Sequence, residues 1–491
     1  MPITQIVIFG ASGDLTARKL IPALVGNARA GSLEGEIQVI GVSRSSRTSE
    51  AWRDELARWL PDSDLPVWRA LAPHVHYIAG SVLSADFLAG LSAKLDDLAA
   101  GENPGRLFYL ALKPTLFAPV VEGLSAAGMI QCPPGAEEGW RRVVVEKPFG
   151  TDLQTAMALN RVLLSHLRED QIFRIDHYLG KETVQNILAF RFQNAIFEPL
   201  WSREHVESVE ISVCEEVGME GGRGGYYDTA GALRDMVQNH VLQVLALIAM
   251  EPPASMAADA VRSEKVKVLS SLRIPSPAEV ARDVVRGQYL ASEARVSGYL
   301  QEQGVPDGSD TETYVAIRAG IDNWRWSGVP FFLRTGKCMH QRYTEVILNF
   351  RVPPVDLLNG PVQGAACAMR PNSLHLLIQP HEQIRLGFLV KQPGPGTMMR
   401  PAMLKFDYRD IQTEPTAPAY QRLLLDAIEG NATLFIRGDE TEAAWRFADA
   451  IREGWQAPGA DPIHGYHAGS MGPAAADALF RGCEGTWGRG S

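Results

Sequence analysis

The stretch that decides the fold covers residues 6–16 and reads Ile6-Val7-Ile8-Phe9-Gly10-Ala11-Ser12-Gly13-Asp14-Leu15-Thr16. Four apolar residues predict a buried strand, and the glycines after them predict a tight turn into a helix. The backbone N–H groups of such a turn, together with the helix N-terminus, can bind a pyrophosphate. The spacing is only Gly-x-x-Gly, because Ser12 and Leu15 occupy the other two glycine places of the full dinucleotide-binding pattern. Taken alone, the turn is equally typical of a simple connection between a strand and a helix.

The surrounding sequence repeats the same strand-and-helix order. Almost continuously apolar strand candidates lie at residues 6–9, 38–42, 75–78, 107–112 and 143–145. Continuous apolar strands indicate burial on both faces, as in a parallel sheet covered by helices. Segments with helical spacing lie between them at residues 18–30, 51–60, 85–99 and 116–127. This order predicts an α/β Rossmann-like dinucleotide-binding domain over residues 1–180, with the glycine turn where such folds bind nucleotides.

The pattern changes after about residue 180. Strand candidates at residues 206–213, 331–334, 345–352, 374–379 and 383–390 mostly follow one another without helices between them, which favours a mostly antiparallel sheet. Helices are predicted at residues 229–250, 419–428 and 440–453, and loops at 353–354, 392–401 and 456–462. We therefore expect residues 181–491 to form one larger α+β domain that binds the substrate.

Composition excludes several functions. The chain has 47 Lys and Arg against 57 Asp and Glu, a formal charge of -10, and no basic block, which argues against nucleic-acid binding. The most apolar run, residues 241–250, is far shorter than the roughly 20 residues that span a membrane. Five scattered cysteines form no Cys-x-x-Cys pair, and the N-terminal residues show no secretory signal. We expect a cytoplasmic protein without a nucleic-acid or membrane partner.

The end of the second predicted strand indicates the cofactor. NAD sites place an acidic residue there for the ribose hydroxyls, whereas this chain has Ser43-Arg44-Ser45-Ser46-Arg47. A guanidinium beside hydroxyls suits a 2'-phosphate, which a carboxylate would repel. We therefore predict NADP, with NAD as a weaker alternative. Arg44 and Arg47 would also be typical of solvated loop positions.

Three further segments concentrate polar residues. Lys147 follows the strand at residues 143–145, at the sheet edge where ligands bind in such folds. Residues 174–181 combine Asp176, His177, Tyr178 and Lys181, and the helix predicted at residues 229–250 carries Asp235-Met236-Val237-Gln238-Asn239-His240. Singly, each is more often structural than functional. Together they supply phosphate donors and a histidine base with a carboxylate to orient it, which sugar-phosphate oxidation requires.

These segments resemble the glucose-6-phosphate 1-dehydrogenase family. The resemblance rests on six motifs in family order, which extend over nearly the whole chain: residues 10–20 (GASGDLTARKL), 146–150 (EKPFG), 174–182 (RIDHYLGKE), 235–240 (DMVQNH), 328–337 (GVPFFLRTGK) and 467–473 (HAGSMGP). The nine-residue block at 174–182 is the most specific of them.

The resemblance implies a reaction and a set of residue roles. It implies oxidation of β-D-glucose 6-phosphate at C1 to 6-phospho-D-glucono-1,5-lactone with hydride transfer to NADP, the first step of the oxidative pentose phosphate pathway. His240 would be the general base and Asp176 its carboxylate partner. The implied substrate-binding residues are Lys147, His177, Tyr178, Lys181, Glu215, Asp235, Lys337 and Arg342, and the expected cofactor-binding residues are Gly10, Ser12, Gly13, Asp14, Leu15, Arg44, Ser45 and Lys147.

The family pattern further implies a cis peptide bond at Lys147–Pro148, no metal, and a homodimer or homotetramer formed through the large sheet of the second domain. The choice of Glu215 over Glu216 is a judgement, because the loop after them is one residue longer than in some relatives. Arg342 replaces a lysine of some relatives, which keeps the charge and alters its geometry.

Two alternatives stay open from the residues alone. One is a metal-dependent sugar-phosphate hydrolase or isomerase with His177, His240, Asp176 and Glu215 as ligands, although these residues lack the helical spacing of metal motifs. The other is a non-catalytic relative that binds sugar phosphate and NADP.

Overall fold

A computed structural model describes residues 3–293, 295, 297–355, 372–411, 417–481 and 487–488. The chain divides into two compact units. The first comprises Met1–Glu182, Pro253–Glu264 and Thr416–Glu442, and the second comprises Thr183–Pro252, Lys265–Pro415 and Ala443–Ser491. The first break lies close to the predicted boundary at residue 180, but the first unit also takes in two later segments that the sequence analysis assigned to the second domain.

The first unit is built on a seven-stranded sheet, sheet A. Its strands are β1 (Ile3–Phe9), β2 (Glu36–Ser43), β3 (Val75–Ala79), β4 (Gly105–Leu110), β5 (Arg141–Val145), β6 (Ile172–Ile175) and β15 (Phe435–Ile436). The spatial order is β15-β6-β5-β4-β1-β2-β3, with parallel pairing throughout except that β15 runs antiparallel to β6. All five strands predicted in the first 150 residues are present.

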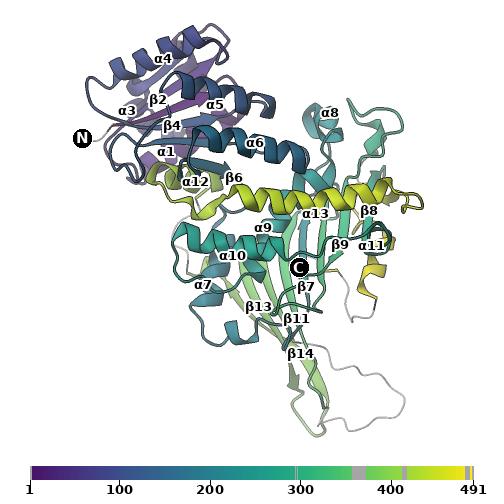
Figure 1. The fold of residues 1–491 in the computed structure, drawn as a ribbon. Coiled ribbons are helices and arrows are strands. Elements are labelled where there is room, and N and C mark those ends of the chain that lie inside the picture. The colour runs from purple at the N-terminus through teal and green to yellow at the C-terminus, as the bar shows by residue number, and fades with distance from the viewer. Residues whose placement is uncertain are drawn as a thin grey trace. The chain divides into compact units, whose positions relative to one another are not determined.

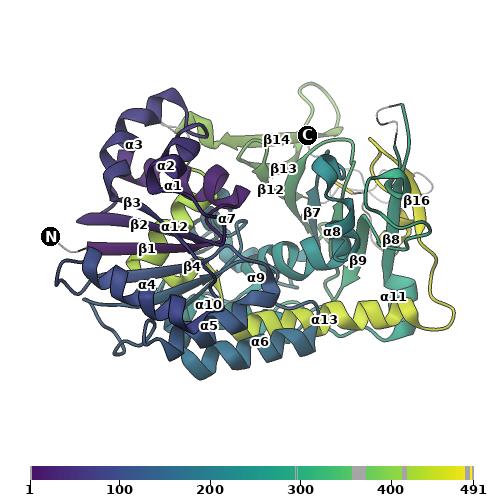
Figure 2. The same cartoon turned by 90° about the horizontal axis from the view of Figure 1, so that it is seen from above.

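Helices cover both faces of sheet A. Figure 2 shows α1 (Ile21–Arg29), α2 (Ser49–Ala57) and α3 (Leu65–Leu71) on one face. It shows α4 (Ala85–Leu98), α5 (Phe117–Ala126) and α6 (Leu153–His166) on the other. The strand order and the two helical layers confirm the doubly wound, Rossmann-like fold. The strand ends of sheet A are therefore where a nucleotide is expected.

The second unit is built on a nine-stranded sheet, sheet B (Figure 1). Its strands are β7 (Val206–Cys214), β8 (Val284–Leu290), β9 (Tyr314–Ala319), β10 (Phe331–Gly336), β11 (Tyr343–Phe350), β12 (Ser373–Gln379), β13 (Gln383–Lys391), β14 (Met399–Asp407) and β16 (His464–His467). The order is β14-β13-β12-β11-β7-β10-β9-β8-β16. β10 pairs with β7 and β16 pairs with β8 in parallel, and the other neighbours are antiparallel, which confirms a larger domain with a mostly antiparallel sheet.

The remaining helices are α7 (Glu182–Phe192), α8 (Gly224–Asp228), α9 (Leu242–Ala249), α10 (Ala258–Ser270), α11 (Pro277–Asp283), α12 (Ala419–Glu429) and α13 (Gly438–Gln456), with boundaries between the units falling inside α10 and α13. Every residue of α9 is buried. Two tryptophan side chains form hydrogen bonds with the C-terminal end of α9. Trp201 Nε1 donates to the Ile248 carbonyl at 2.7 Å, and Trp326 Nε1 donates to the Ala249 carbonyl at 2.8 Å. This buried helix continues the π-helix η8 (Leu233–Val241), which packs against β7 and β10.

Three sequence expectations need correction. The helix predicted over residues 229–250 is interrupted, because Gly231 has φ +69° and residues 233–241 form a π-helix. The loop predicted over residues 392–401 ends at Met399, where β14 begins; Pro401 within that edge strand weakens the sequence signal. The helix at 419–428 belongs to the first unit, where α12 packs against α1 and Asn27 Nδ2 donates to the Gln421 carbonyl at 2.9 Å.

The sequence analysis also missed six strands and six helices of the structure: β6, β8, β9, β14, β15, β16, α3, α6, α7, α8, α10 and α11. Within the residues that the structure describes, no helix is both long and apolar enough to cross a membrane.

Candidate active site

The glycine turn after β1 is held against the ends of two neighbouring strands. The Gly10 and Ala11 N–H groups donate to the Val42 carbonyl at the end of β2, at 2.9 and 3.2 Å. Gly10 has φ +88°, and a Cβ at this position would lie 2.0 Å from the Ala111 carbonyl oxygen beyond β4. Only glycine fits such a backbone and such a close approach. The turn can therefore bring its main chain close to a ligand.

The rest of the turn leads into an exposed helix N-terminus. Ser12, Gly13 and Asp14 are exposed, and Leu15 is half-buried where the helical segment begins. The Ser12 and Ser43 hydroxyls lie 2.8 Å apart and link the turn to the end of β2. The structure thus brings the predicted residues Gly10, Ser12, Gly13, Asp14 and Leu15 into one cradle of the kind that fits a pyrophosphate.

The two arginines after β2 differ in their surroundings. Arg47 forms an ion pair with Glu55 of α2. Arg44 is exposed and has no ion pair or hydrogen bond among the residues that the structure describes. The loop between them is fixed, because the Tyr77 hydroxyl donates to the Ser45 carbonyl at 2.8 Å. Arg44 is therefore the arginine available to a 2'-phosphate.

Lys147 follows β5, and the Lys147–Pro148 bond is cis, as the family pattern implies. The preceding residue, Glu146, is buried and accepts hydrogen bonds from the hydroxyls of Tyr109 at 2.5 Å and Tyr420 at 3.2 Å. Desolvation raises the pKa of Glu146, while the two tyrosine hydrogen bonds oppose that shift. Sequence reasoning missed this cluster, because Tyr109 and Tyr420 lie on β4 and α12, far from Glu146 in the chain.

Residues 176–181 form a compact group of polar side chains in the first unit. Asp176 is 1% exposed, and its Oδ1 accepts the Tyr178 N–H at 2.8 Å. The Lys181 Nζ atom lies 3.2 Å from the centroid of the Tyr178 ring, and the His177 and Tyr178 ring centroids lie 5.2 Å apart. Three of the predicted phosphate-binding side chains therefore meet around one tyrosine ring.

A second group of predicted residues meets in the second unit. Glu215 follows β7 and Lys337 follows β10, and because these strands are parallel neighbours their ends coincide. The two side chains form an ion pair, and the Lys337 Nζ atom lies 5.4 Å from the centroid of the Tyr227 ring. Glu216 is exposed, and the ion pair therefore favours Glu215 as the site residue.

Asp235 lies near the same ring. Desolvation and, next in size, the charge of Asp235 raise the pKa of the Tyr227 hydroxyl well above its usual value. Arg342 lies in the loop before β11 with an exposed side chain. No described contact assigns a ligand to Arg342, and its predicted role stays a prediction.

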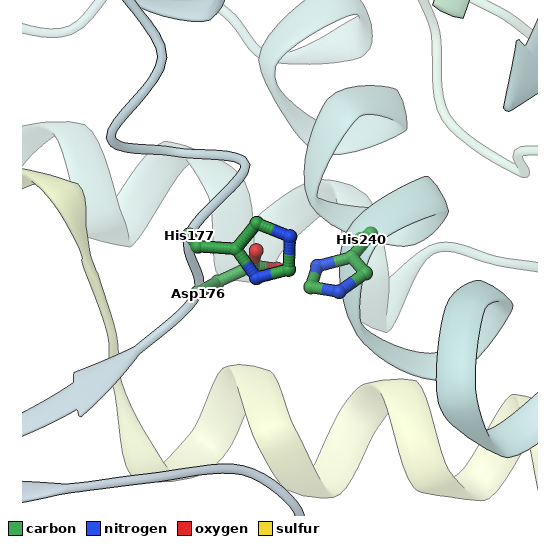
Figure 3. A group of neighbouring side chains, drawn as sticks. All are labelled: Asp176, His177 and His240. Atoms are coloured by element: carbon green, nitrogen blue, oxygen red, sulfur yellow. The ribbon is translucent and has the colours of Figure 1, made fainter. Parts of the chain in front are cut away.

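His240 lies on the π-helix η8 and is fully buried, and its backbone N–H donates to the side-chain oxygen of Asn239 at 2.7 Å. Figure 3 shows His240 on its helical turn and Asp176 and His177 on the extended segment after β6. π-Helical turns are rare in proteins and are frequent at functional sites. The unusual helix thus coincides with the residue that the sequence singled out as the base.

The first unit has a doubly wound sheet with a glycine turn after β1 and an exposed arginine after β2. A larger domain with a mostly antiparallel sheet follows it. This combination defines the class of protein as a dinucleotide-dependent oxidoreductase. Two family models match the chain: the NAD binding domain of glucose-6-phosphate dehydrogenase over residues 7–186, and the C-terminal domain of the same enzyme over residues 188–488. The chain belongs to the glucose-6-phosphate dehydrogenase family.

Full-length relatives agree with this assignment. The glucose-6-phosphate 1-dehydrogenase of Aggregatibacter actinomycetemcomitans is 42% identical, covering 99% of this chain and 97% of its own. That of Zymomonas mobilis is 41% identical over 99% of each chain. A solved glucose-6-phosphate dehydrogenase in complex with its substrate glucose-6-phosphate is 34% identical, has a TM-score of 0.88, and covers 99% of this chain and 98% of its own. The expectation of an NADP-dependent oxidoreductase of this family is confirmed.

Proposed function

We propose that this chain oxidises β-D-glucose 6-phosphate at C1 to 6-phospho-D-glucono-1,5-lactone with NADP, the first step of the oxidative pentose phosphate pathway. The observation that carries the proposal is the match of both family domains, in order, over nearly the whole chain. When bound, NADP supplies the hydride acceptor. The glycine turn binds its pyrophosphate, and Arg44 with Ser45 binds its 2'-phosphate.

The 6-phosphate of the sugar is held by His177, Tyr178 and Lys181. The support is their grouping around the Tyr178 ring, where an ammonium, a hydroxyl and an imidazole are near one another in the same six residues. Charge-assisted hydrogen bonds from such donors are the strong contacts of a phosphate. Arg342 adds a further cation, so this end of the substrate is recognised mainly by charge.

The sugar hydroxyls are held by Lys147, Glu215, Asp235 and Lys337. The Glu215–Lys337 ion pair presents an acceptor and a donor side by side, which matches a hydroxyl group because a hydroxyl both donates and accepts. Contacts of this kind fix the orientation of C1, and correct orientation of the reacting groups can contribute much of an enzyme's rate.

His240 takes the proton of the C1 hydroxyl as hydride leaves C1. An imidazole has a near-neutral pKa and is therefore suited to act as a base at physiological pH. Asp176 stabilises the imidazolium that forms. Its own orientation is set by the Tyr178 N–H, which Oδ1 accepts at 2.8 Å. Phosphate binding and general-base catalysis therefore depend on the same short segment.

The test is a spectrophotometric assay with the substitution His240→Asn. Wild type should produce NADPH from glucose 6-phosphate and NADP. In His240→Asn kcat should fall by about 100-fold or more, because general-base catalysis contributes on this scale, while the KM for glucose 6-phosphate stays within a few-fold. His464→Asn is the matched control, because His464 is half-buried and pairs with Asp461 in the second unit. Lack of turnover in wild type would refute the proposal, and equal losses of kcat and sugar affinity in His240→Asn would identify a structural histidine.

A metal-dependent sugar-phosphate hydrolase or isomerase is the second candidate, since Asp176, His177 and His240 are also residue types that bind metals. The same assay separates the two functions. The proposed dehydrogenase keeps its full rate after treatment with EDTA, whereas loss of turnover on chelation, restored by a divalent cation, would favour the metal enzyme.

The proposal includes a homodimer or homotetramer formed through sheet B and a cytoplasmic location. A sheet of nine strands offers a broad surface for self-association. Light scattering coupled to size exclusion should give the mass of two or four chains, and the mass of a single chain at micromolar concentration would contradict the assembly.

A further inference from the structure

Glu312 is a buried carboxylate at the start of the helix that carries Asp235 and His240. It is 8% exposed and lies two residues before β9. Its backbone carbonyl accepts the Ala232 N–H at 2.9 Å, and its side-chain Oε1 accepts the Leu233 N–H at 2.8 Å. One residue of a distant segment therefore accepts two successive N–H groups of the helix.

These contacts replace a local cap. The first N–H groups of a helix have no partner within the helix, and a polar side chain at the N-cap usually accepts one of them. The N-cap residue of η8 is Ala232, which has no such side chain. A carboxylate also favours the positive end of the helix dipole. Glu312 thus supplies from outside what the helix lacks in its own sequence.

Thr313, the residue after Glu312, contacts the backbone of Lys337, one of the proposed sugar-binding residues. The Lys337 N–H donates to the Thr313 carbonyl at 2.9 Å, directly after Glu312 in the chain. Gly231 leaves the carboxylate its space, since a Cβ at residue 231 would lie 2.4 Å from Glu312 Oε1. The segment 312–313 therefore touches both the start of η8 and the backbone that carries Lys337.

We propose that Glu312 is a positioning residue, whose carboxylate fixes the start of η8 and so holds Asp235 and His240 in place relative to Lys337. Asp235 lies two residues after Leu233 and His240 seven residues after it, so a displaced or rotated first turn moves both side chains. The inference rests on the proposed function of Asp235 and His240. It predicts that the hydrogen-bond acceptor at residue 312 matters more than its charge.

Two conservative substitutions separate these effects. Glu312→Gln keeps the length and an acceptor oxygen for the Leu233 N–H but loses the charge. Glu312→Asp keeps the charge, but its side chain is one methylene shorter and falls short of that N–H. Asp310→Asn is the matched control, because Asp310 is an exposed carboxylate on the same segment, two residues earlier.

The measurements are kcat and KM for both substrates, glucose 6-phosphate affinity by calorimetry, and the melting temperature of the full chain. In Glu312→Asp we expect kcat/KM for glucose 6-phosphate to fall by about 10- to 100-fold, since displacements near 1 Å can cost that much. Calorimetric affinity for the sugar phosphate should also fall, while the KM for NADP stays within about two-fold. Glu312→Gln and Asp310→Asn should remain within a few-fold of wild type.

Several results would overturn the positioning role. These are wild-type kcat/KM in Glu312→Asp, equal losses in Glu312→Gln and Glu312→Asp, or a lowered melting temperature with unchanged kcat/KM. Failure of the proposed function is distinguishable, because wild type and Asp310→Asn would then show no turnover either.

Discussion

Replacing Arg44 by alanine should weaken NADP selectively. Arg44 is exposed after β2, where the ribose of a dinucleotide lies in this fold, and Arg47 three residues later is already paired with Glu55. NADP and NAD differ only in the 2'-phosphate, so an interaction with that group affects one cofactor and spares the other. The ratio of the two responses thus isolates the contact.

The size of the effect follows from the exposure of Arg44. A hydrogen bond to a charged group contributes about 1.5–3 kcal/mol, and exposed ion pairs contribute about 0–1 kcal/mol because water and salt screen them. For an exposed guanidinium on a dianionic phosphate we expect about 1–2 kcal/mol, which corresponds to about 5- to 30-fold in kcat/KM for NADP. The value for NAD should change by less than about two-fold, and the loss should shrink at high ionic strength.

The assay measures initial rates with each cofactor at saturating glucose 6-phosphate. Arg47→Ala is the matched control. It removes a guanidinium from the same loop, and Glu55 already neutralises that guanidinium. Equal losses for NADP and NAD in Arg44→Ala would refute the 2'-phosphate role. A larger NADP-specific loss in Arg47→Ala than in Arg44→Ala would show that the wrong arginine has been assigned.

Two further predictions concern stability. Burial raises the pKa of Glu210 on β7 from 4.5 to about 7, so unfolding releases a proton between these values and the free energy of unfolding falls as pH rises from about 4.5 to about 7. Glu210→Gln should abolish this contribution, roughly 3 kcal/mol in all. The urea midpoint of Glu210→Gln relative to that of wild type should therefore rise as pH rises from about 4.5 to about 7. A difference between the two midpoints that stays constant with pH would contradict the raised pKa of Glu210. Gly10→Ala should lower the melting temperature and NADP affinity more than Gly31→Ala. Both positions have positive φ, but only at Gly10 does a new Cβ meet backbone, 2.0 Å from the Ala111 oxygen. The positive φ alone costs alanine about 1–2 kcal/mol at either position. Similar melting temperatures in the two variants would show that the turn at Gly10 can move to accommodate the new Cβ.

Local patterns were sufficient to predict the first five strands of sheet A. A buried parallel strand is apolar along its whole length, so β1 to β5 are visible as short apolar runs, and Gly10 and Gly13 mark the turn after the first of them. The edge strand β15 escaped prediction because it has two residues and follows the rest of sheet A by more than 250 positions. A strand of that length has no periodicity to detect.

Contacts between distant segments were not predictable from local patterns. Glu146 meets Tyr420 across 274 positions, and Glu312 meets Leu233 across 79. Neither pair has a spacing that indicates contact, because sheet order and helix packing bring the partners together. Most residues proposed for direct chemical roles lie in recognisable motifs, whereas Glu312, which we propose orients them, lies in none.

The chain is acidic overall and yet binds two anions. The cations of the proposed site differ in their surroundings. Lys337 is paired with Glu215, and the pair has little net charge with which to attract a phosphate, although it can donate to and accept from a neutral hydroxyl. Lys181 lies against the face of the Tyr178 ring, a contact that stabilises an ammonium. Arg44 is exposed at the surface. Because Glu215 neutralises Lys337, a Glu215→Gln substitution should leave Lys337 more attractive to inorganic phosphate. Competitive inhibition by phosphate should strengthen in that variant, and unchanged inhibition would argue that the Lys337 charge does not face the substrate.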